Sequence, residues 1–319
     1  MVTMKSSNTI NKGLSQRQTT ILNPISCSGI GVHTNKEVSL NIKPAPADSG
    51  IIFHRTDLGS AALISAEVKN VVDTRLCTVL SKPGYGGQLR VATVEHLMAA
   101  LFGCKIDNAL IEIDGPEVPI MDGSAAPFVY LLERAGKKEL DALRRAIKVI
   151  KEIKVENEER FVKISPADNF SISCEVNFDH SLIGRQLIAY SENNNFKDEL
   201  SRARTFCMEA DILKMRSAGL ALGGSLNNAV VFSEDNVLNE GGLRFPDEPV
   251  RHKALDLVGD LALAGYPIIG RVEAICPGHA MNFDIVSALL SESDSWEVVY
   301  IPFEEAGIDF PIAAAGGGA

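Results

Sequence analysis

The segment from Pro249 to Gly265, PVRHKALDLVGDLALAG, combines a helical repeat of apolar residues with a row of ionisable ones. Its alanine, leucine and valine residues recur at intervals of three and four, which predicts a helix with one face toward a core. Pro249 suits a first helical turn, and Gly265 before Tyr266 and Pro267 suits a helix end. The fold must therefore supply an apolar partner for this helix and a place for its polar row.

That polar row consists of His252, Asp256 and Asp260, which follow one another at four-residue intervals and so lie along one stripe. An imidazole and a carboxylate one turn apart are ligands directed toward one point, and this donor pair suits zinc. A solvated helix face would have the same spacing. The segment alone leaves both interpretations open.

A second amphipathic helix is predicted within the string TVEHLMAALFG, residues 93–103, from apolar residues at helical spacing. Thr93 suits the N-cap and Gly103 the end of this helix. Glu95 and His96 fall in the first turn, off the main apolar face, where the helix dipole stabilises a carboxylate. An ordinary charged first turn is the alternative.

Taken together, the two helices could form a metal site. Catalytic zinc commonly takes three protein ligands and leaves a fourth position for water. His252 and Asp256 need a third ligand from elsewhere, and His96 is the best candidate. Glu95 would then lie beside the metal, where a general base for the water belongs. Asp260 is too far along the helix to ligate but could orient another histidine.

Composition restricts the class of protein. The chain has 319 residues, a formal charge of −10 and a pI of about 5.2, and it lacks the basic footprint of nucleic-acid binding. We expect two domains. It contains no apolar run long enough to span a membrane, and because its first residues are polar we expect no secretory signal. Its six cysteines form no Cys-x-x-Cys pair, which favours reduced thiols and a cytoplasmic location.

The order of predicted elements indicates an α+β fold with two similar halves. Strands followed by helices are expected twice, with a boundary near residues 137–147, a charged stretch with little pattern. Residues 170–178 alternate as a strand with one wet face does. His33, which follows a glycine-containing turn, is predicted to be a hydrogen-bonded loop residue rather than a ligand.

Several enzyme classes lack their usual signatures here. We find no phosphate-binding G-x-x-x-x-G-K-[ST] or G-x-G-x-x-G loop, no G-x-S-x-G nucleophile elbow and no His-Glu-x-x-His. Six strings, however, occur together in the order of one family: TVEHLMAAL (93–101), PEVPIMDGSAAPFV (116–129), ARTF (203–206), GGSL (223–226), LRFPDEPVRHKALDLVGDL (243–261) and PGHAMN (277–282). They closely resemble the UDP-3-O-acyl-N-acetylglucosamine deacetylases, the zinc amidases of lipid A biosynthesis, and the resemblance extends from about Thr20 to about Phe303.

The resemblance implies roles for the residues at the metal. His96, His252 and Asp256 match the zinc ligands, and Glu95 matches the general base that activates water. One Zn²⁺ per chain is expected, with Fe²⁺ as an alternative in vivo.

The resemblance also assigns the remaining catalytic and binding positions. His279 matches a second catalytic histidine, and Asp260 its carboxylate partner. Thr205 matches a hydroxyl that donates to the oxyanion, and Lys253 a substrate-binding cation.

The expected substrate carries a long acyl chain, which needs an apolar channel. In the family an insert in the second domain builds this channel, and residues of about 203–232 align with that insert. The candidate lining residues, for which plain core packing is the alternative, are Phe206, Ile212, Ala221 and Leu226. Asn227 departs from the family, which usually has an acidic residue there, and this puts fine substrate contacts in question rather than the reaction.

The resemblance further implies two similar domains, each a β-sheet layer packed against paired α-helices, with the active site between them. The predicted divisions are a flexible extension over 1–19, domain I over 20–140 with Glu95 and His96, domain II over 147–303 with His252, Asp256 and His279, and a tail over 304–319.

The expected function is zinc-dependent hydrolysis of the acetamide of UDP-3-O-(3-hydroxyacyl)-N-acetylglucosamine. We expect a monomer whose partner is the UDP-linked acylated amino sugar, without nucleic acid and without stable membrane insertion. The alternatives are a zinc deacetylase of another acetylated amino sugar and a non-catalytic sugar- or lipid-binding homologue.

Overall fold

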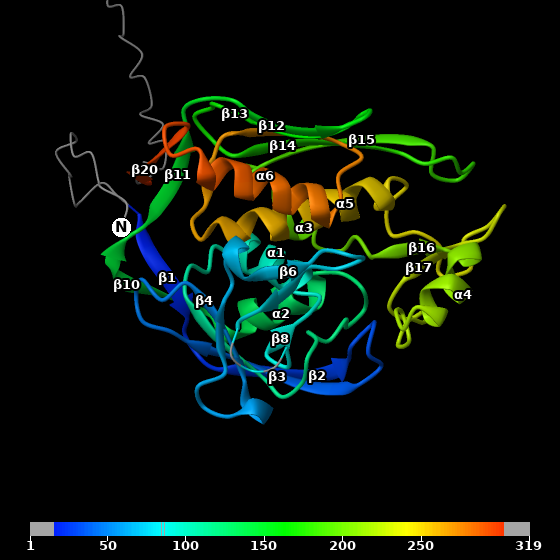
Figure 1. Cartoon of the computed structure of the whole chain (residues 1–319), viewed down its shortest axis with the longest axis horizontal. Coiled ribbons are helices and arrows are strands. Elements are labelled where there is room, and N and C mark those ends of the chain that lie inside the picture. The colour runs from blue at the N-terminus through cyan, green and yellow to red at the C-terminus, as the bar shows by residue number, and fades with distance from the viewer. Residues whose placement is uncertain (1–15, 84, 86, 303–319) are drawn as a thin grey trace, which may run out of the picture.

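The computed structural model describes residues 16–302 except 84 and 86 (Figure 1). In Figure 1, two sheets form the outer layers and the longer helices lie between them. This part of the chain is mixed α and β, as the sequence predicted. It contains no helix long and apolar enough to cross a membrane.

The first large sheet has the strand order β2-β3-β9-β4-β5. Its central strand, β9, pairs antiparallel with β3 and parallel with β4. The inner positions of β3 and β9 are apolar and buried, because a sheet with one covered face alternates buried and exposed residues. The bounds are β2 (Ile25–Ile30), β3 (Glu37–Pro44), β4 (Ile51–Arg55), β5 (Leu63–Ser65) and β9 (Ala109–Ile113).

The second large sheet repeats this topology with the order β12-β13-β19-β14-β15. Its central strand, β19, again pairs antiparallel on one side and parallel on the other. The strand predicted over residues 170–178 is present as β14 and alternates as expected. The bounds are β12 (Ile153–Asn157), β13 (Arg160–Ser165), β14 (Ser171–Asn177), β15 (Arg185–Ser191) and β19 (Arg271–Ile275).

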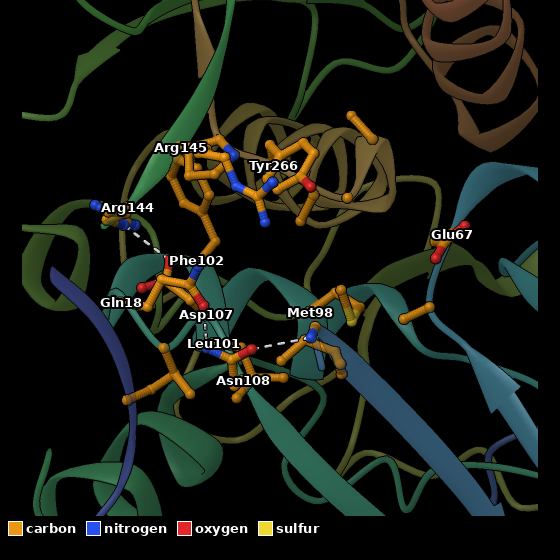
Figure 2. Close-up of a pocket in the computed structure, with 18 of the residues that line it drawn as sticks. Gln18, Glu67, Met98, Leu101, Phe102, Asp107, Asn108, Arg144, Arg145 and Tyr266 are labelled. Carbon is orange, nitrogen blue, oxygen red and sulfur yellow. Dashed lines mark hydrogen bonds and ion pairs between the residues drawn. The ribbon is translucent and has the colours of Figure 1, made fainter. Parts of the chain in front are cut away.

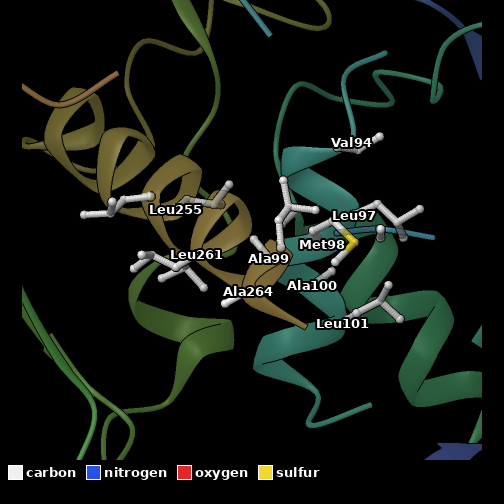
Figure 3. Close-up of a cluster of buried hydrophobic side chains, with 14 of the residues drawn as sticks. Val94, Leu97, Met98, Ala99, Ala100, Leu101, Leu255, Leu261 and Ala264 are labelled. Atoms are coloured by element: carbon white, nitrogen blue, oxygen red, sulfur yellow. The ribbon is translucent and has the colours of Figure 1, made fainter. Parts of the chain in front are cut away.

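Four helices fill the space between the sheets, and in each half one precedes and one follows the central strand. Figure 3 shows α1 and α5 in contact through their apolar side chains. The bounds are α1 (Glu95–Gly103), α2 (Ala126–Ala135), α5 (Glu248–Leu261) and α6 (His279–Ser291). Helix α5 continues as the short helix η3 (Ala262–Ala264) and stops at Gly265, whose φ of 86° is left-handed. This is the helix end that the sequence predicted.

Thr93 does not cap α1, contrary to the prediction. The N-cap residue is Val94, and Thr93 has a φ of 58°. Its hydroxyl donates instead to the buried carboxylate of Glu117, at 3.1 Å. Gly103 is the last residue of the helix, as expected.

Short strands join the two halves at the edge near the described chain ends (Figure 1). Strand β1 (Arg17–Ile21) pairs with β10 (Lys137–Leu143), and β11 (Arg145–Val149) lies between β18 (Ile268–Ile269) and β20 (Trp296–Tyr300). Residues 17–19 are thus in a strand rather than in the extension predicted over 1–19. The patternless stretch predicted at 137–147 is also largely strand. Residues 1–15 and the predicted tail over 304–319 lie outside the described residues.

The segment predicted as an insert forms a small unit that projects from the body of the molecule (Figure 1). Strand β16 (Phe206–Met208) runs parallel to β17 (Val230–Phe232), and α4 (Glu209–Ser217) follows β16. The remaining short elements are η1 (Thr56–Leu58), η2 (Val68–Asn70), β6 (Val71–Asp73), β7 (Val79–Ser81), β8 (Arg90–Val91) and α3 (Phe196–Glu199).

Candidate metal and acid–base site

The site lies where the first turn of α1 meets the middle of α5. Gly259 of α5 permits this approach, since a Cβ atom placed there would be 2.1 Å from the carbonyl oxygen of Glu95. The close contact brings His96 of α1 opposite His252 and Asp256 of α5. All three side chains are buried, with exposures of 2% to 4%. These residues therefore lie neither on a solvated helix face nor in an ordinary charged first turn, which were the two alternatives to a metal site.

The side chains of His96, His252 and Asp256 form a candidate metal site. Their ligand atoms lie within 4.8 Å of one another. Asp256 Oδ1 is 3.3 Å from His252 Nε2 and 3.6 Å from His96 Nε2. Donors about 2.1 Å from a tetrahedral ion are themselves about 3.4 Å apart, so this spacing fits a zinc-sized ion.

Asp256 provides an independent test of that fit. Its Oδ1 atom is buried without a hydrogen-bond partner, whereas Oδ2 accepts a hydrogen bond from Lys253 Nζ at 2.9 Å. A buried carboxylate oxygen without a partner is costly. A cation at the centre of the three residues would remove that cost, so the residues present fit a metal.

The protonation states of the ligands suit metal binding. His252 Nδ1 donates to the carbonyl oxygen of Ala203 at 3.0 Å, which leaves Nε2 as the lone-pair donor facing Asp256. Burial lowers the pKa of His252 to about 3, so its ring is neutral. Burial opposes ionisation of Asp256, but the positive charge of Lys253, whose Nζ donates to Oδ2, helps to hold the pKa of Asp256 well below its ordinary value.

An acid–base group adjoins the metal ligands. Glu95 Oε1 is 3.8 Å from His279 Nε2, and the opposite ring nitrogen, Nδ1, donates to Asp260 Oδ2 at 2.8 Å. All three side chains are at least nine-tenths buried. The structure therefore places the Glu95 carboxylate, the His279 imidazole and the Asp260 carboxylate in a row, and His279 is paired with the carboxylate that the resemblance implied for it.

The environments of Glu95 and His279 shift their pKa values in a useful direction. Burial raises the pKa of Glu95, which makes this carboxylate a stronger base. Burial by itself lowers the pKa of His279, but the charges of Asp260 and Glu95 outweigh it and raise that pKa to about 9. At neutral pH the imidazole is thus protonated and can act as an acid.

Thr205 reaches the site from the segment that precedes β16. Its backbone N–H donates to the Gly123 carbonyl at 2.7 Å, and its carbonyl accepts from Val230 N at 2.8 Å. The preceding residue, Arg204, is held by the buried carboxylate of Glu248, with a shortest contact of 2.8 Å. These bonds fix the backbone, and the Thr205 side chain lines the cavity in front of the metal ligands.

That cavity has a volume of about 720 Å³ and is lined by the metal ligands and by the projecting unit. Lys253 lines it as well, 5.8 Å from the centre of the Phe206 ring. The four candidate channel residues all line this cavity: Phe206, Ile212, Ala221 and Leu226. Leu226 is half exposed, at 48%, which is unlike core packing. Asn227 is exposed and lies outside the lining residues.

His33 also lines this cavity and behaves as predicted for a loop residue. Its Nδ1 accepts a hydrogen bond from Ala221 N at 3.2 Å, and its own backbone N–H donates to Glu117. Burial lowers the pKa of His33. The ring therefore helps to attach the projecting unit to the first half of the chain.

A smaller cavity of about 370 Å³ lies at the C-terminal ends of α1 and α5, away from the metal ligands (Figure 2). Its cationic side chains are engaged within the protein. Arg144 Nε donates to Asp107 at 2.8 Å, and the Arg145 guanidinium lies 5.0 Å from the centre of the Tyr266 ring. Candidate ligands and titratable groups with shifted pKa values gather instead around the larger cavity, which makes it the better functional site.

Sequence reasoning missed three residues of the site. Thr78 donates to Asp260 Oδ1 at 2.6 Å, Asn282 donates to Asp260 Oδ2 at 2.8 Å, and Gly259 permits the close helix contact. Asn282 lies inside the string PGHAMN and Gly259 interrupts a strong helical pattern, so both carried a readable signal. Thr78 carried none, because nothing local distinguishes it from a strand threonine.

Comparison with known proteins gives the family of this chain. The family model described as LpxC, UDP-3-O-acyl N-acetylglycosamine deacetylase, matches residues 18–291. Relatives that bear the name UDP-3-O-acyl-N-acetylglucosamine deacetylase match most of this chain. The protein of Acidithiobacillus ferrooxidans is 46% identical over 286 residues, which cover 89% of this chain and 93% of the relative.

Two further relatives match to a similar extent. The protein of Syntrophotalea carbinolica is 47% identical over 88% of this chain and 90% of its own length. The protein of Haemophilus influenzae is 43% identical over 91% of this chain and 94% of its own length. These matches confirm the resemblance drawn from the sequence strings. The chain belongs to the UDP-3-O-acyl N-acetylglycosamine deacetylase family.

Proposed function

We propose that this chain hydrolyses the acetamide of UDP-3-O-(3-hydroxyacyl)-N-acetylglucosamine, releasing acetate and the free amine, UDP-3-O-(3-hydroxyacyl)-glucosamine. This is a step of lipid A biosynthesis. The observation that carries the proposal is the buried group of His96, His252 and Asp256, with an unpartnered carboxylate oxygen at its centre and a paired base and acid beside it. Membership of the deacetylase family supplies the substrate.

We propose Zn²⁺ as the metal, because two imidazoles and one carboxylate are a frequent donor set of catalytic zinc. Fe²⁺ is the alternative in vivo, since imidazole also suits iron. When bound, such an ion supplies Lewis acidity, which polarises a carbonyl and lowers the pKa of a coordinated water to about 7. Lys253, bonded to the outer oxygen of Asp256, helps to keep that ligand ionised.

Glu95 is the general base in this mechanism. Its Oε1 accepts a proton from the attacking water as the oxygen forms a bond to the acetyl carbonyl carbon. Burial raises the pKa of Glu95, so proton uptake is more favourable than for an exposed carboxylate. The Thr205 hydroxyl donates a hydrogen bond to the carbonyl oxygen as negative charge develops there, and this stabilisation is strong because the site holds little water.

His279 is the general acid. The carbon–nitrogen bond breaks as Nε2 of the protonated ring delivers its proton to the departing amine, and acetate remains as the other product. Asp260 holds the opposite nitrogen at 2.8 Å, which keeps the ring oriented and stabilises its charge. The cavity in front of the ligands receives the acyl chain along Phe206, Ile212, Ala221 and Leu226, and Lys253 serves as a cation for the anionic substrate.

We also propose the division into domain I, 20–140, and domain II, 147–303, with the site between them. The repeated sheet topology and the convergence of α1 with α5 support it. A cytoplasmic location and a monomeric state belong to the proposal as well and rest on the sequence alone.

Three acetylated substrates test the proposal: the full UDP-linked acyl sugar, the same compound without its acyl chain, and N-acetylglucosamine. Release of acetate from the first, with a kcat/KM at least about a hundredfold above the others, is expected if the cavity contributes acyl binding energy. Equal rates for all three would favour a deacetylase of another amino sugar. Binding of the acyl sugar without acetate release would favour a non-catalytic protein.

A further inference from the structure

We propose that Thr78 is a positioning residue that sets the geometry of both the general acid and the general base. This inference rests on the proposed function. Thr78 immediately precedes β7 in the first half of the chain, and its side chain is 2% exposed. It faces Asp260 on α5, which is 182 residues further along.

The hydroxyl of Thr78 fixes the carboxylate that orients His279. It donates to Asp260 Oδ1 at 2.6 Å, while Asp260 Oδ2 accepts from His279 Nδ1 and Asn282 Nδ2, each at 2.8 Å. Donors on both oxygens define the rotation of the carboxylate about its bond to Cβ. Without the hydroxyl, Asp260 could rotate toward its remaining partners, and the His279 ring would turn with it.

The backbone of the same residue fixes the base. Thr78 N–H donates to Glu95 Oε2 at 3.0 Å. This bond directs the other oxygen, Oε1, toward His279 Nε2, which is 3.8 Å away. Thr78 therefore fixes the base Glu95 directly and the acid His279 through Asp260. Loss of its hydroxyl would change the position of His279 relative to Glu95.

A purely structural role is the competing explanation, because the neighbours Cys77, Val79 and Leu80 are buried apolar residues. Valine distinguishes the two roles, since it keeps the β-branched shape of threonine and lacks only the hydroxyl. Serine keeps the hydroxyl and loses a methyl group. If the role of Thr78 is purely structural, the valine variant should be more active than the serine variant. If Thr78 positions the acid and base, the serine variant should be more active than the valine variant.

The experiment compares steady-state acetate release by full-length wild type, Thr78→Val and Thr78→Ser, each loaded with zinc and checked for metal content. Thr20→Val is the matched control, since Thr20 is also 2% exposed and its hydroxyl accepts from Ala45 N at 3.0 Å, in β1. We expect Thr78→Val to lower kcat by about 10- to 100-fold, the effect of one lost hydrogen bond to a charged group. KM should stay within about twofold, and Thr78→Ser within about threefold of wild-type kcat.

Wild-type kcat in Thr78→Val, an effect confined to KM, or a loss in Thr78→Ser as large as in Thr78→Val would overturn the inference. A comparable loss of kcat in Thr20→Val would overturn it too, because buried threonines in general would then matter. Should Thr78→Val not fold, Thr78→Ala takes its place, with the same prediction relative to serine. Absence of acetate release by the wild type would refute the proposed function instead.

Discussion

Gly259→Ala tests whether the site depends on the close contact between α1 and α5. The added Cβ would lie 2.1 Å from the carbonyl oxygen of Glu95 and 2.8 Å from its carbonyl carbon. These are backbone atoms, so no side-chain rotation can relieve the overlap. The helices must separate by about 1 Å to restore an ordinary contact distance.

Two opposing terms set the change in stability. Alanine in place of glycine inside a helix favours folding by about 1 kcal/mol. Forcing an extra group into a well-packed contact costs about 1–3 kcal/mol. The expected net change in the free energy of unfolding is therefore a loss of at most about 2 kcal/mol, and the variant should fold. Activity should suffer more, because a 1 Å misplacement of catalytic groups costs about a hundredfold.

The assay is acetate release with parallel thermal unfolding and metal analysis. Gly241→Ala is the matched control, since a Cβ there meets nothing within 4 Å. We expect Gly259→Ala to lose about a hundredfold in kcat and Gly241→Ala to lose nothing. Wild-type kcat in Gly259→Ala, together with a higher melting temperature, would refute the reasoning, because the helix propensity alone would then have decided the outcome.

Three further predictions concern the metal, the pH dependence and the channel. Asp256→Ala should bind less than about a tenth of the wild-type metal and lose at least about a hundredfold in kcat, as metal analysis and acetate release would show; full metal content would contradict the assigned ligand. The rate should rise with pH as Glu95 loses its proton, at a pKa above the ordinary value, and fall as His279 loses its proton near pH 9. The His279→Gln variant should lose the decrease in rate near pH 9. If that decrease persisted in the variant, His279 would not be the acid. Ala221→Phe should narrow the cavity and lower kcat/KM for long acyl chains by at least about tenfold relative to short ones, whereas an equal effect on both would exclude Ala221 from the channel.

Much of the helical part of the fold could be predicted from the sequence. The period of apolar residues identified both site helices, and Pro249 and Gly265 marked the start and end of the longer one. The hydrophobic period succeeds here because α1 and α5 pack against each other through it, as Figure 3 shows. Period alone could not show that Glu95 and His96 are buried, since this depends on the partner helix.

The strands near the junction were harder to predict for a physical reason. Among residues 16–302 that the structure describes, strand β10 pairs only with β1, and its residues Lys137 to Glu139 are exposed. A two-stranded ribbon on the surface needs no apolar alternation, so the local sequence gave no signal. The register between β10 and β1 is set by pairing between segments more than a hundred residues apart, such as Arg17 with Leu143.

The site was predictable to the extent that its chemistry is local. His252, Asp256 and Asp260 share a helix, and the usual count of zinc ligands led to His96. Thr78 escaped prediction because its contacts with Asp260 and Glu95 are made across the fold and leave no trace in neighbouring residues.

The most direct test is acetate release from UDP-3-O-(3-hydroxyacyl)-N-acetylglucosamine by the purified chain, by a chelated sample and by Glu95→Gln. Activity that disappears on chelation and returns with added zinc is predicted, together with a loss of at least about a hundredfold in Glu95→Gln at unchanged metal content. Activity that survives complete metal removal, or a Glu95→Gln variant as fast as the wild type, would contradict the account.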